Sequence, residues 1–144
     1  MTLRAALASA ADRPELGALR RLVFVDEQAV PAELERDELD AVATHAVVRD
    51  EAGRLVGTGR VVVGSAGVAR IGRMAVAAEA RRTGVGSALL AVLEAAAVDA
   101  GCTRVELHAQ AHATGFYGRA GYAVEGEPFD EAGIRHVAMA KSLS

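Results

Sequence analysis

The segment Arg81-Arg82-Thr83-Gly84-Val85-Gly86-Ser87 constrains the fold of this 144-residue chain more than any other feature. It follows an apolar, β-branched run that ends at Val76, and it opens a stretch rich in alanine and leucine that reaches Ala100. The run predicts a strand and the stretch predicts a long helix, which Gly101 would end. Because helix crossovers join parallel neighbouring strands, a mixed α/β sheet is indicated, with the strands before and after this helix side by side.

The glycine turn in this segment could hold an anion. A helix N-terminus carries unpaired N–H groups and a partial positive charge, and glycines let a ligand come close to them. The side chains of Arg81, Arg82 and Ser87 could add further bonds. The alternative is a glycine-assisted helix start with solvated arginines. Two familiar phosphate motifs do not fit, because Leu89 stands where a dinucleotide fingerprint needs a small residue and no Gly-Lys-Ser/Thr sequence follows.

The rest of the chain continues the mixed pattern. Asp12 and Pro14 begin an amphipathic helix, and the strongly acidic segment 26–40 predicts a loop with a short helix. The order of elements is β-α-α-β-β-β-α-β-α-β-β. We expect strands at 3–8, 45–48, 55–63, 68–76, 103–109, 122–127 and 136–141, and the principal helices at 12–25, 81–100 and 113–119.

Composition limits the classes of function. The length predicts one domain covering 1–144, and 51% apolar residues are enough to bury a core. A net charge of -3, with two tyrosines, three phenylalanines and no tryptophan, argues against a nucleic-acid partner. No run of about 18 apolar residues predicts a membrane span. The single cysteine, Cys102, forms no internal disulfide, which fits a cytoplasmic location, and no Cys/His group has the spacing of a zinc site.

A second motif lies downstream: Gln110-x-x-Ala113-x-x-Phe116-Tyr117-x-x-x-Gly121-Tyr122. Together with the strand ending at Val76 and Arg81-x-x-Gly84-x-Gly86, it resembles the GNAT superfamily of acyl-CoA-dependent N-acyltransferases. Small bacterial single-domain members also carry Val23-Phe24 with Glu27-Gln28, and Gln110-x-His112-Ala113. The resemblance covers nearly the whole chain. It implies a mostly antiparallel sheet of six to seven strands, a splayed parallel pair at its centre and about four helices.

The same resemblance implies acetyl-CoA as cofactor. Backbone N–H groups from Arg82 to Ser87 would hold the pyrophosphate, and the pantetheine arm would lie in the gap beside the strand ending at Val76. Gln110 would bond the arm or the splayed backbone. The cofactor-binding residues implied are Met74, Ala75, Val76, Arg81, Arg82, Thr83, Gly84, Val85, Gly86, Ser87, Gln110, Phe116 and Tyr117.

Acyl transfer from a thioester to an amine needs two proton movements. An alkyl amine has a pKa of ~10.4, so its deprotonation at neutral pH costs about 4 to 5 kcal/mol. The leaving thiolate has a pKa of ~8.5, and a phenol at ~10 is close enough to protonate it. Tyr117 is therefore the candidate general acid; the alternative is a packed aromatic at a helix start.

The base is less defined by the sequence. The strand 70–76 holds no carboxylate, so a base there is not carried over from the family. His112 could relay a proton through water or contact the substrate; the alternative is a hydrogen-bonded structural histidine. Glu106 and His108 alternate onto the other face from Val105 and Leu107.

The acidic segment has two interpretations. Glu27, Asp37 and Asp40, together with Glu125 and Glu127, could attract a cationic amine, or the segment could be a solvated helical face. Gln28, next to Glu27, is a further candidate substrate contact.

The pattern favours an N-acetyltransferase that moves the acetyl group of acetyl-CoA to a primary amine by direct attack, without a metal. The amine could be a small molecule or part of a protein. The alternatives are an acyl-CoA-binding sensor without turnover and a dinucleotide-dependent enzyme. A homodimer joined through the last strands would be ordinary for the resemblance.

Overall fold

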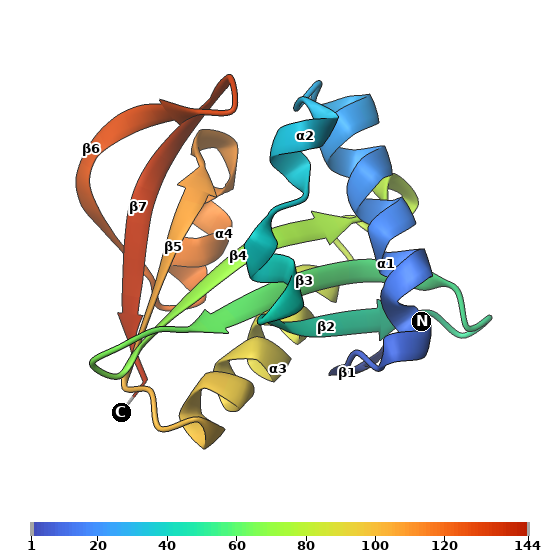
Figure 1. The fold of residues 1–144 in the computed structure, drawn as a ribbon, viewed down its shortest axis with the longest axis horizontal. Helices are drawn as coiled ribbons and strands as arrows, with labels where there is room; N and C mark the ends of the chain where they lie inside the picture. Colours follow the sequence, from blue (N-terminus) through green and yellow to red (C-terminus); the bar gives the residue numbers. More distant parts are fainter. Residues whose placement is uncertain (1, 144) are drawn as a thin grey trace.

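A mixed sheet of seven strands forms the centre of the computed structural model, which describes residues 2–143 (Figure 1). Its strand order is β1-β2-β3-β4-β5-β7-β6, and every neighbouring pair is antiparallel except β4 and β5, which are parallel. The predicted fold class is confirmed. The strands are β1 (Arg4–Leu7), β2 (Thr44–Arg49), β3 (Leu55–Val63), β4 (Val68–Val76), β5 (Arg104–Gln110), β6 (Ala123–Glu131) and β7 (Ile134–Ser142).

Helices cover both faces of the sheet. In Figure 1 the helices α1 and α2 lie on the face toward the viewer, and α3 and α4 lie on the other face. No helix within residues 2–143 is both long and apolar enough to cross a membrane. The helices are α1 (Arg13–Arg20), the π-helical turn η2 (Arg21–Glu27), α2 (Ala32–Glu35), α3 (Val85–Asp99), α4 (Thr114–Arg119) and the short 3-10 turns η1 (Ala10–Asp12), η3 (Glu38–Ala41), η4 (Ala78–Ala80) and η5 (Ala111–Ala113).

The long helix α3 packs its apolar side on the sheet. Leu89 and Leu93 are fully buried there. The approach is close because β3 contributes Gly57, where an added Cβ would lie 2.3 Å from the Val85 side chain. Larger side chains at this position would push the start of α3 away from the sheet.

Several predicted boundaries are wrong. The long helix begins at Val85, not at residue 81, because Gly84 adopts the left-handed conformation and interrupts helical geometry before it. The last hairpin is longer than expected, since Ala132 and Gly133 both have positive φ and form a tight connection. As a result, β6 extends through Glu131 and β7 begins at Ile134, beyond the predicted ends at residues 127 and 136.

Candidate active site

The sheet opens between β4 and β5. Their parallel pairing runs from Val68 opposite Arg104 to Ile71 opposite Leu107 and then stops, although both strands continue. On its other side β4 stays paired with β3 as far as Val76. Within the described residues, no strand therefore pairs with segment 72–76 on the β5 side. Backbone groups along that edge are available to an extended ligand.

The N-terminus of α3 follows the end of this open segment. Gly84 has φ +94°, and apart from its chain neighbours no described residue lies within 4 Å of where its Cβ would be, so the space on that side of Gly84 is open. The first bond that closes on Gly84 comes from the Ala88 N–H at 3.0 Å. The preceding N–H groups, at residues 85–87, are the unpaired donors of a helix start. The Thr83 hydroxyl is used inside the turn, where it donates to the Ala80 carbonyl at 2.5 Å.

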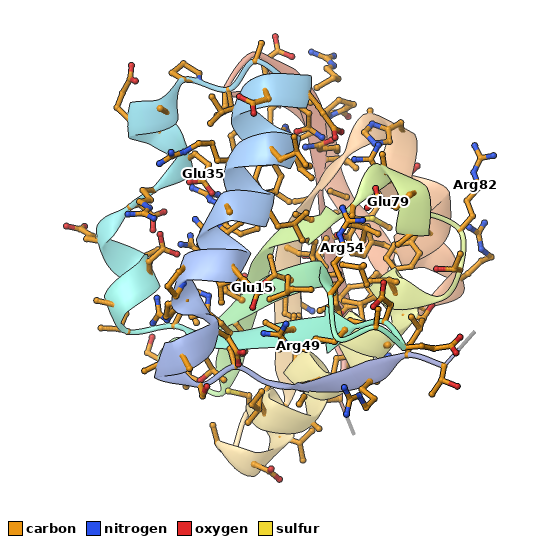
Figure 2. All side chains as sticks on the ribbon, turned by 90° about the vertical axis from the view of Figure 1, so that its right-hand side faces the viewer. Glu15, Glu35, Arg49, Arg54, Glu79 and Arg82 are labelled. Atoms are coloured by element: carbon orange, nitrogen blue, oxygen red, sulfur yellow. The ribbon has the colours of Figure 1, made fainter. Side chains whose placement is uncertain are left out.

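The two arginines of the turn differ. Arg81 donates to the Val76 carbonyl at 3.1 Å and pairs with Glu27 at 2.6 Å, so much of its charge is shared within the protein. Arg82 is exposed, projects from the molecule in Figure 2 and makes no side-chain hydrogen bond or ion pair with the residues described. Arg82 is thus the guanidinium that remains free for an anion.

Glu27 and its neighbour Gln28 link the two strands where they have separated. Gln28 and Gln110 exchange amide hydrogen bonds of 3.3 and 2.9 Å across 82 residues. Glu27 pairs with Arg81, just beyond β4, while Gln110 ends β5. The last turn of η2 therefore bridges the open end of the gap. Glu27 and Gln28, the expected substrate contacts, thus bind Arg81 and Gln110, which were expected to contact the cofactor.

Tyr117 stands on α4 with its ring in the core. It is 8% exposed and meets the rings of Phe116 and Tyr122 edge to face at 4.9 and 5.9 Å between centroids. Burial raises the pKa of Tyr117 to about 12. Its hydroxyl makes no hydrogen bond to the described residues, yet no fully buried side-chain polar atom among them lacks a partner. The hydroxyl therefore reaches an accessible surface as a protonated donor.

The remaining two expected site residues lie apart from these contacts. His112 is exposed in η5 and has no partner in the described part of the chain. Asp37 instead pairs with Arg60 at 2.6 Å and with Arg73 at 3.2 Å, and the hydrogen bond from Arg60 lowers the pKa of Asp37.

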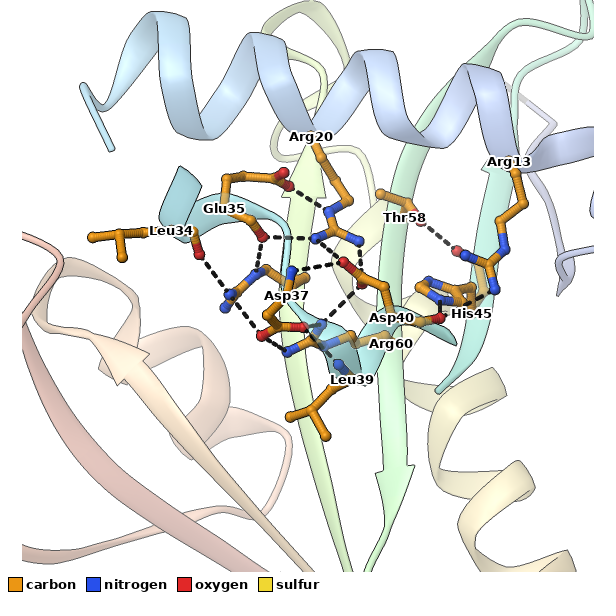
Figure 3. Close-up of polar contacts among 12 residues, drawn as sticks. Arg13, Arg20, Leu34, Glu35, Asp37, Leu39, Asp40, His45, Thr58 and Arg60 are labelled. Atoms are coloured by element: carbon orange, nitrogen blue, oxygen red, sulfur yellow. Dashed lines mark hydrogen bonds and ion pairs between the residues drawn. The ribbon is translucent and has the colours of Figure 1, made fainter. Parts of the chain in front are cut away.

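Asp37 belongs to an ion network that Figure 3 draws beneath α1. Arg20 donates to Glu35 at 2.5 Å and to Asp40 at 2.7 Å, and Asp40 also accepts from Arg60 at 2.9 Å. The Asp37 and Asp40 carboxylates are thus held by arginines of the protein itself and are not free to attract an amine. Sequence reasoning missed these arginines, because they come from α1, β3 and β4 and no local pattern pairs them with it.

The open strand edge, the unpaired helix-start donors and the free Arg82 suit a phosphate carrier with an extended arm, so these residues fit coenzyme A. Gly86 has a further reason to be glycine, since an added Cβ would lie 2.8 Å from the Phe116 ring. This contact keeps α4 close to the start of α3. Tyr117 follows Phe116 on that helix.

Comparison with known proteins gives consistent matches. Residues 11–143 match the family model of the acetyltransferase (GNAT) domain. The uncharacterized N-acetyltransferase YjcF of Bacillus subtilis is 42% identical over 124 residues, which are 85% of this chain and 87% of that protein. An acyl-CoA N-acyltransferase from Pseudomonas aeruginosa superposes with a TM-score of 0.83 at 33% identity over 97% of this chain and 99% of its own.

A more distant structure shows the fold alone. The N-acetylglutamate synthase from Neisseria gonorrhoeae, solved with coenzyme A and N-acetyl-glutamate, superposes with a TM-score of 0.78 at 19% identity. The match covers 100% of this chain and 36% of that chain.

Proposed function

This chain belongs to the GNAT acetyltransferase family, whose cofactor is acetyl-CoA, and on that premise we propose that it transfers the acetyl group of acetyl-CoA to a primary amine. One observation carries the proposal. The parallel strands β4 and β5 separate after Ile71 and Leu107, and the helix that joins them begins at the open end. The extended arm of a thioester carrier would lie in the gap between β4 and β5, and its diphosphate would lie at the N-terminus of α3.

Backbone donors do most of the binding in this proposal. The N–H groups of Val85, Gly86 and Ser87 would bond the pyrophosphate, helped by the positive end of the α3 dipole. Arg82 would add charge-assisted bonds. Along the arm, the edge of Met74–Ala75–Val76 that β5 leaves unpaired would supply donors and acceptors as a neighbouring strand would, with the Val76 carbonyl shared with Arg81.

Tyr117 would act on the departing sulfur. With a pKa of about 12 its hydroxyl is protonated throughout the neutral range. Against a free thiolate at ~8.5, complete proton transfer would be uphill by about 5 kcal/mol. Burial raises the pKa of a thiol as well, so this mismatch narrows inside the site. Tyr117 therefore stabilises the developing charge with a hydrogen bond first and transfers its proton late.

The acceptor amine would enter beside the bridge of Glu27 and Gln28. The Glu27 carboxylate is already shared with Arg81, so it attracts an ammonium group without holding it strongly in the charged, unreactive form. His112 is exposed on η5, directly after β5, and is available to contact the acceptor. Asp37 would act indirectly, by fixing the segment that follows this bridge.

The test is thiol release from acetyl-CoA with a panel of primary amines, run beside calorimetric titration with coenzyme A and with NAD. We expect coenzyme A to bind and at least one amine to release thiol. A chain that binds acetyl-CoA but releases thiol with no amine would be a sensor. Tighter binding of NAD than of coenzyme A would contradict the site itself.

A further inference from the structure

His108 stands where the two parallel strands begin to separate. It is one residue beyond Leu107, the last β5 residue paired with β4. Side chains alternate along a strand, so His108 lies on the opposite face from Leu107 and Ala109, which are buried in the core. The imidazole remains 30% exposed.

Both ring nitrogens of His108 have partners. The Arg70 guanidinium lies 2.7 Å from Nε2, and the Glu131 carboxylate lies 2.9 Å from Nδ1. A guanidinium only donates and a carboxylate only accepts. Nε2 must therefore carry the lone pair and Nδ1 the proton, which fixes a neutral imidazole in one tautomer.

The surroundings hold this orientation. Phe129 packs edge to face on the His108 ring at 4.9 Å and stacks on His136 at 6.1 Å. His136 is itself fixed by a 2.7 Å bond to the Ile134 carbonyl, and its Nε2 lies 3.9 Å from Glu131. Residues from β5, β6 and β7 thus orient one imidazole, and within residues 2–143 the hydrogen-bond partner of its Nε2 is the exposed side chain of Arg70.

We propose that His108 is the base that takes the proton from the acceptor amine, with Glu131 as its positioning residue and Arg70 covering Nε2 until the acceptor displaces it. The inference rests on the proposed function and assigns the general base of the acetyl transfer. A carboxylate that holds Nδ1–H while Nε2 faces the reacting group is a general arrangement for an activated histidine. His112 lacks any such orienting partner in the described residues.

The proton and electron balance closes with these groups. The amine nitrogen bonds to the thioester carbonyl carbon, and the carbon–sulfur bond breaks with its electron pair going to sulfur. His108 takes one N–H proton on Nε2, and the Tyr117 hydroxyl gives its proton to the sulfur. Water returns the proton from His108 to the Tyr117 oxygen, so an acetamide and a free thiol leave and both side chains end as they began. An acceptor that arrives as an ammonium ion first loses its extra proton to water.

Several charged or titratable groups surround the imidazole. The groups facing it are Arg70 from β4, Glu131 from β6 and, through Glu131, His136 from β7, while Glu106 shares its strand face and is paired with Arg104.

The kinetic test compares His108→Gln and Glu131→Gln with the control variant Glu106→Gln. This control makes the same Glu-to-Gln change as Glu131→Gln, at a residue on the same strand face as His108. With the best acceptor of the amine panel, His108→Gln should lower kcat/KM about a hundredfold at pH 7. Raising the pH should speed the wild type and His108→Gln alike, because an ammonium acceptor loses its extra proton to water in both, so the deficit should persist at higher pH. Glu131→Gln should lower kcat/KM by a smaller factor, and Glu106→Gln should keep the wild-type value. Calorimetry should show the same affinity for acetyl-CoA in all three variants.

A second readout does not depend on turnover. Long-range ¹H–¹⁵N spectra of protein with ¹⁵N-labelled histidine should show the Nδ1–H tautomer for His108, whose signals are identified by their absence in His108→Gln. In Glu131→Gln the population of this tautomer should be lower. The opposite tautomer in the wild type, or full activity of His108→Gln in an active enzyme, would overturn this inference alone. If the wild type releases thiol with no amine, the proposed function itself fails.

Discussion

Gly84 and Gly86 are glycines for different physical reasons. Gly84 has φ +94°, a conformation that strains other residues, and faces open space. Gly86 lies within helix α3, where any Cβ would collide with the Phe116 ring at 2.8 Å. The first glycine shapes the proposed anion site and the second fixes the packing of α4. The sequence motif alone gives both residues the same role.

Gly84→Asp should raise the coenzyme A dissociation constant by at least about tenfold, the equivalent of 1.4 kcal/mol. The new carboxylate would lie against the pyrophosphate. Calorimetric titration measures the change. Gly53→Asp is the matched control, since Gly53 also has positive φ, +83°, and open space around it but lies in the β2–β3 turn. A similar loss of stability in both variants, with weaker coenzyme A binding only in Gly84→Asp, would support the site. Equal coenzyme A affinity in the two variants would contradict it.

Tyr117→Phe should lower kcat by roughly 10² to 10⁴ while the affinity for coenzyme A stays close to wild type. Phenylalanine keeps the ring contacts with Phe116 and Tyr122, and only the hydroxyl is lost. Tyr122→Phe serves as the control, because the Tyr122 hydroxyl bonds Glu94 at 2.8 Å and has no part in the mechanism. Its loss should lower stability and leave kcat unchanged. Undiminished turnover in Tyr117→Phe would exclude the general-acid role.

At the scale of elements, the segment between η2 and β2 is held by distant arginines. Arg20 of α1 and Arg60 of β3 are 4% and 6% exposed, and their partners Glu35 and Asp40 lie in or beside α2 and η3. Buried charges of this kind are costly when one partner is removed. The network thus fixes the position of the segment that follows Glu27 and Gln28.

Arg20→Met should lower the free energy of unfolding by about 3 kcal/mol, because it leaves the Glu35 carboxylate buried without its partner. Urea denaturation followed by circular dichroism gives the value. The double variant Arg20→Met with Glu35→Leu should recover part of the loss, since it removes the orphaned charge. A double variant less stable than the single one would mean that the pair itself supplies the stability.

Local patterns predicted the elements well and their long-range contacts poorly. The spacing of Leu89 and Leu93 indicated the buried side of α3, and a crossover helix indicated the parallel pair β4–β5; both are observed. The pairing of Gln28 with Gln110 was not predictable from either local pattern, because it depends on where η2 ends relative to the sheet. The longer β6 was missed because the turn at Ala132 carries no strong sequence signal.

At the scale of the whole molecule, stability should depend on pH in two windows. Burial lowers the pKa of His45, although its bond to the Asp40 carbonyl opposes the shift. A lowered folded-state pKa means that the unfolded chain binds the proton first as pH falls. The stability that neutral His45 contributes is therefore complete above about pH 6.5, the pKa of an unperturbed histidine, and declines below it.

The free energy of unfolding should thus fall as the pH drops from about 6.5 to about 5, and His45→Gln should make it level in that range. Urea midpoints at closely spaced pH values measure the slope. A wild-type slope that persists unchanged in His45→Gln would assign the effect to another group.

The second window lies below about pH 4 and belongs to the ion network. Burial alone would raise the pKa of Asp40, but hydrogen bonds and charge from Arg20 and Arg60 outweigh it and hold the pKa far below its usual range. In the unfolded chain Asp40 takes up a proton near the ordinary aspartate pKa of ~3.9, whereas in the folded protein it stays ionised. The free energy of unfolding should therefore fall by about 2 kcal/mol as the pH is lowered from 5 to 2. Asp40→Asn should start less stable at pH 7 and lose less on acidification, because no charge remains there to be protonated. A variant whose acid loss parallels the wild type would show that Asp37, whose pKa Arg60 also lowers, dominates the window.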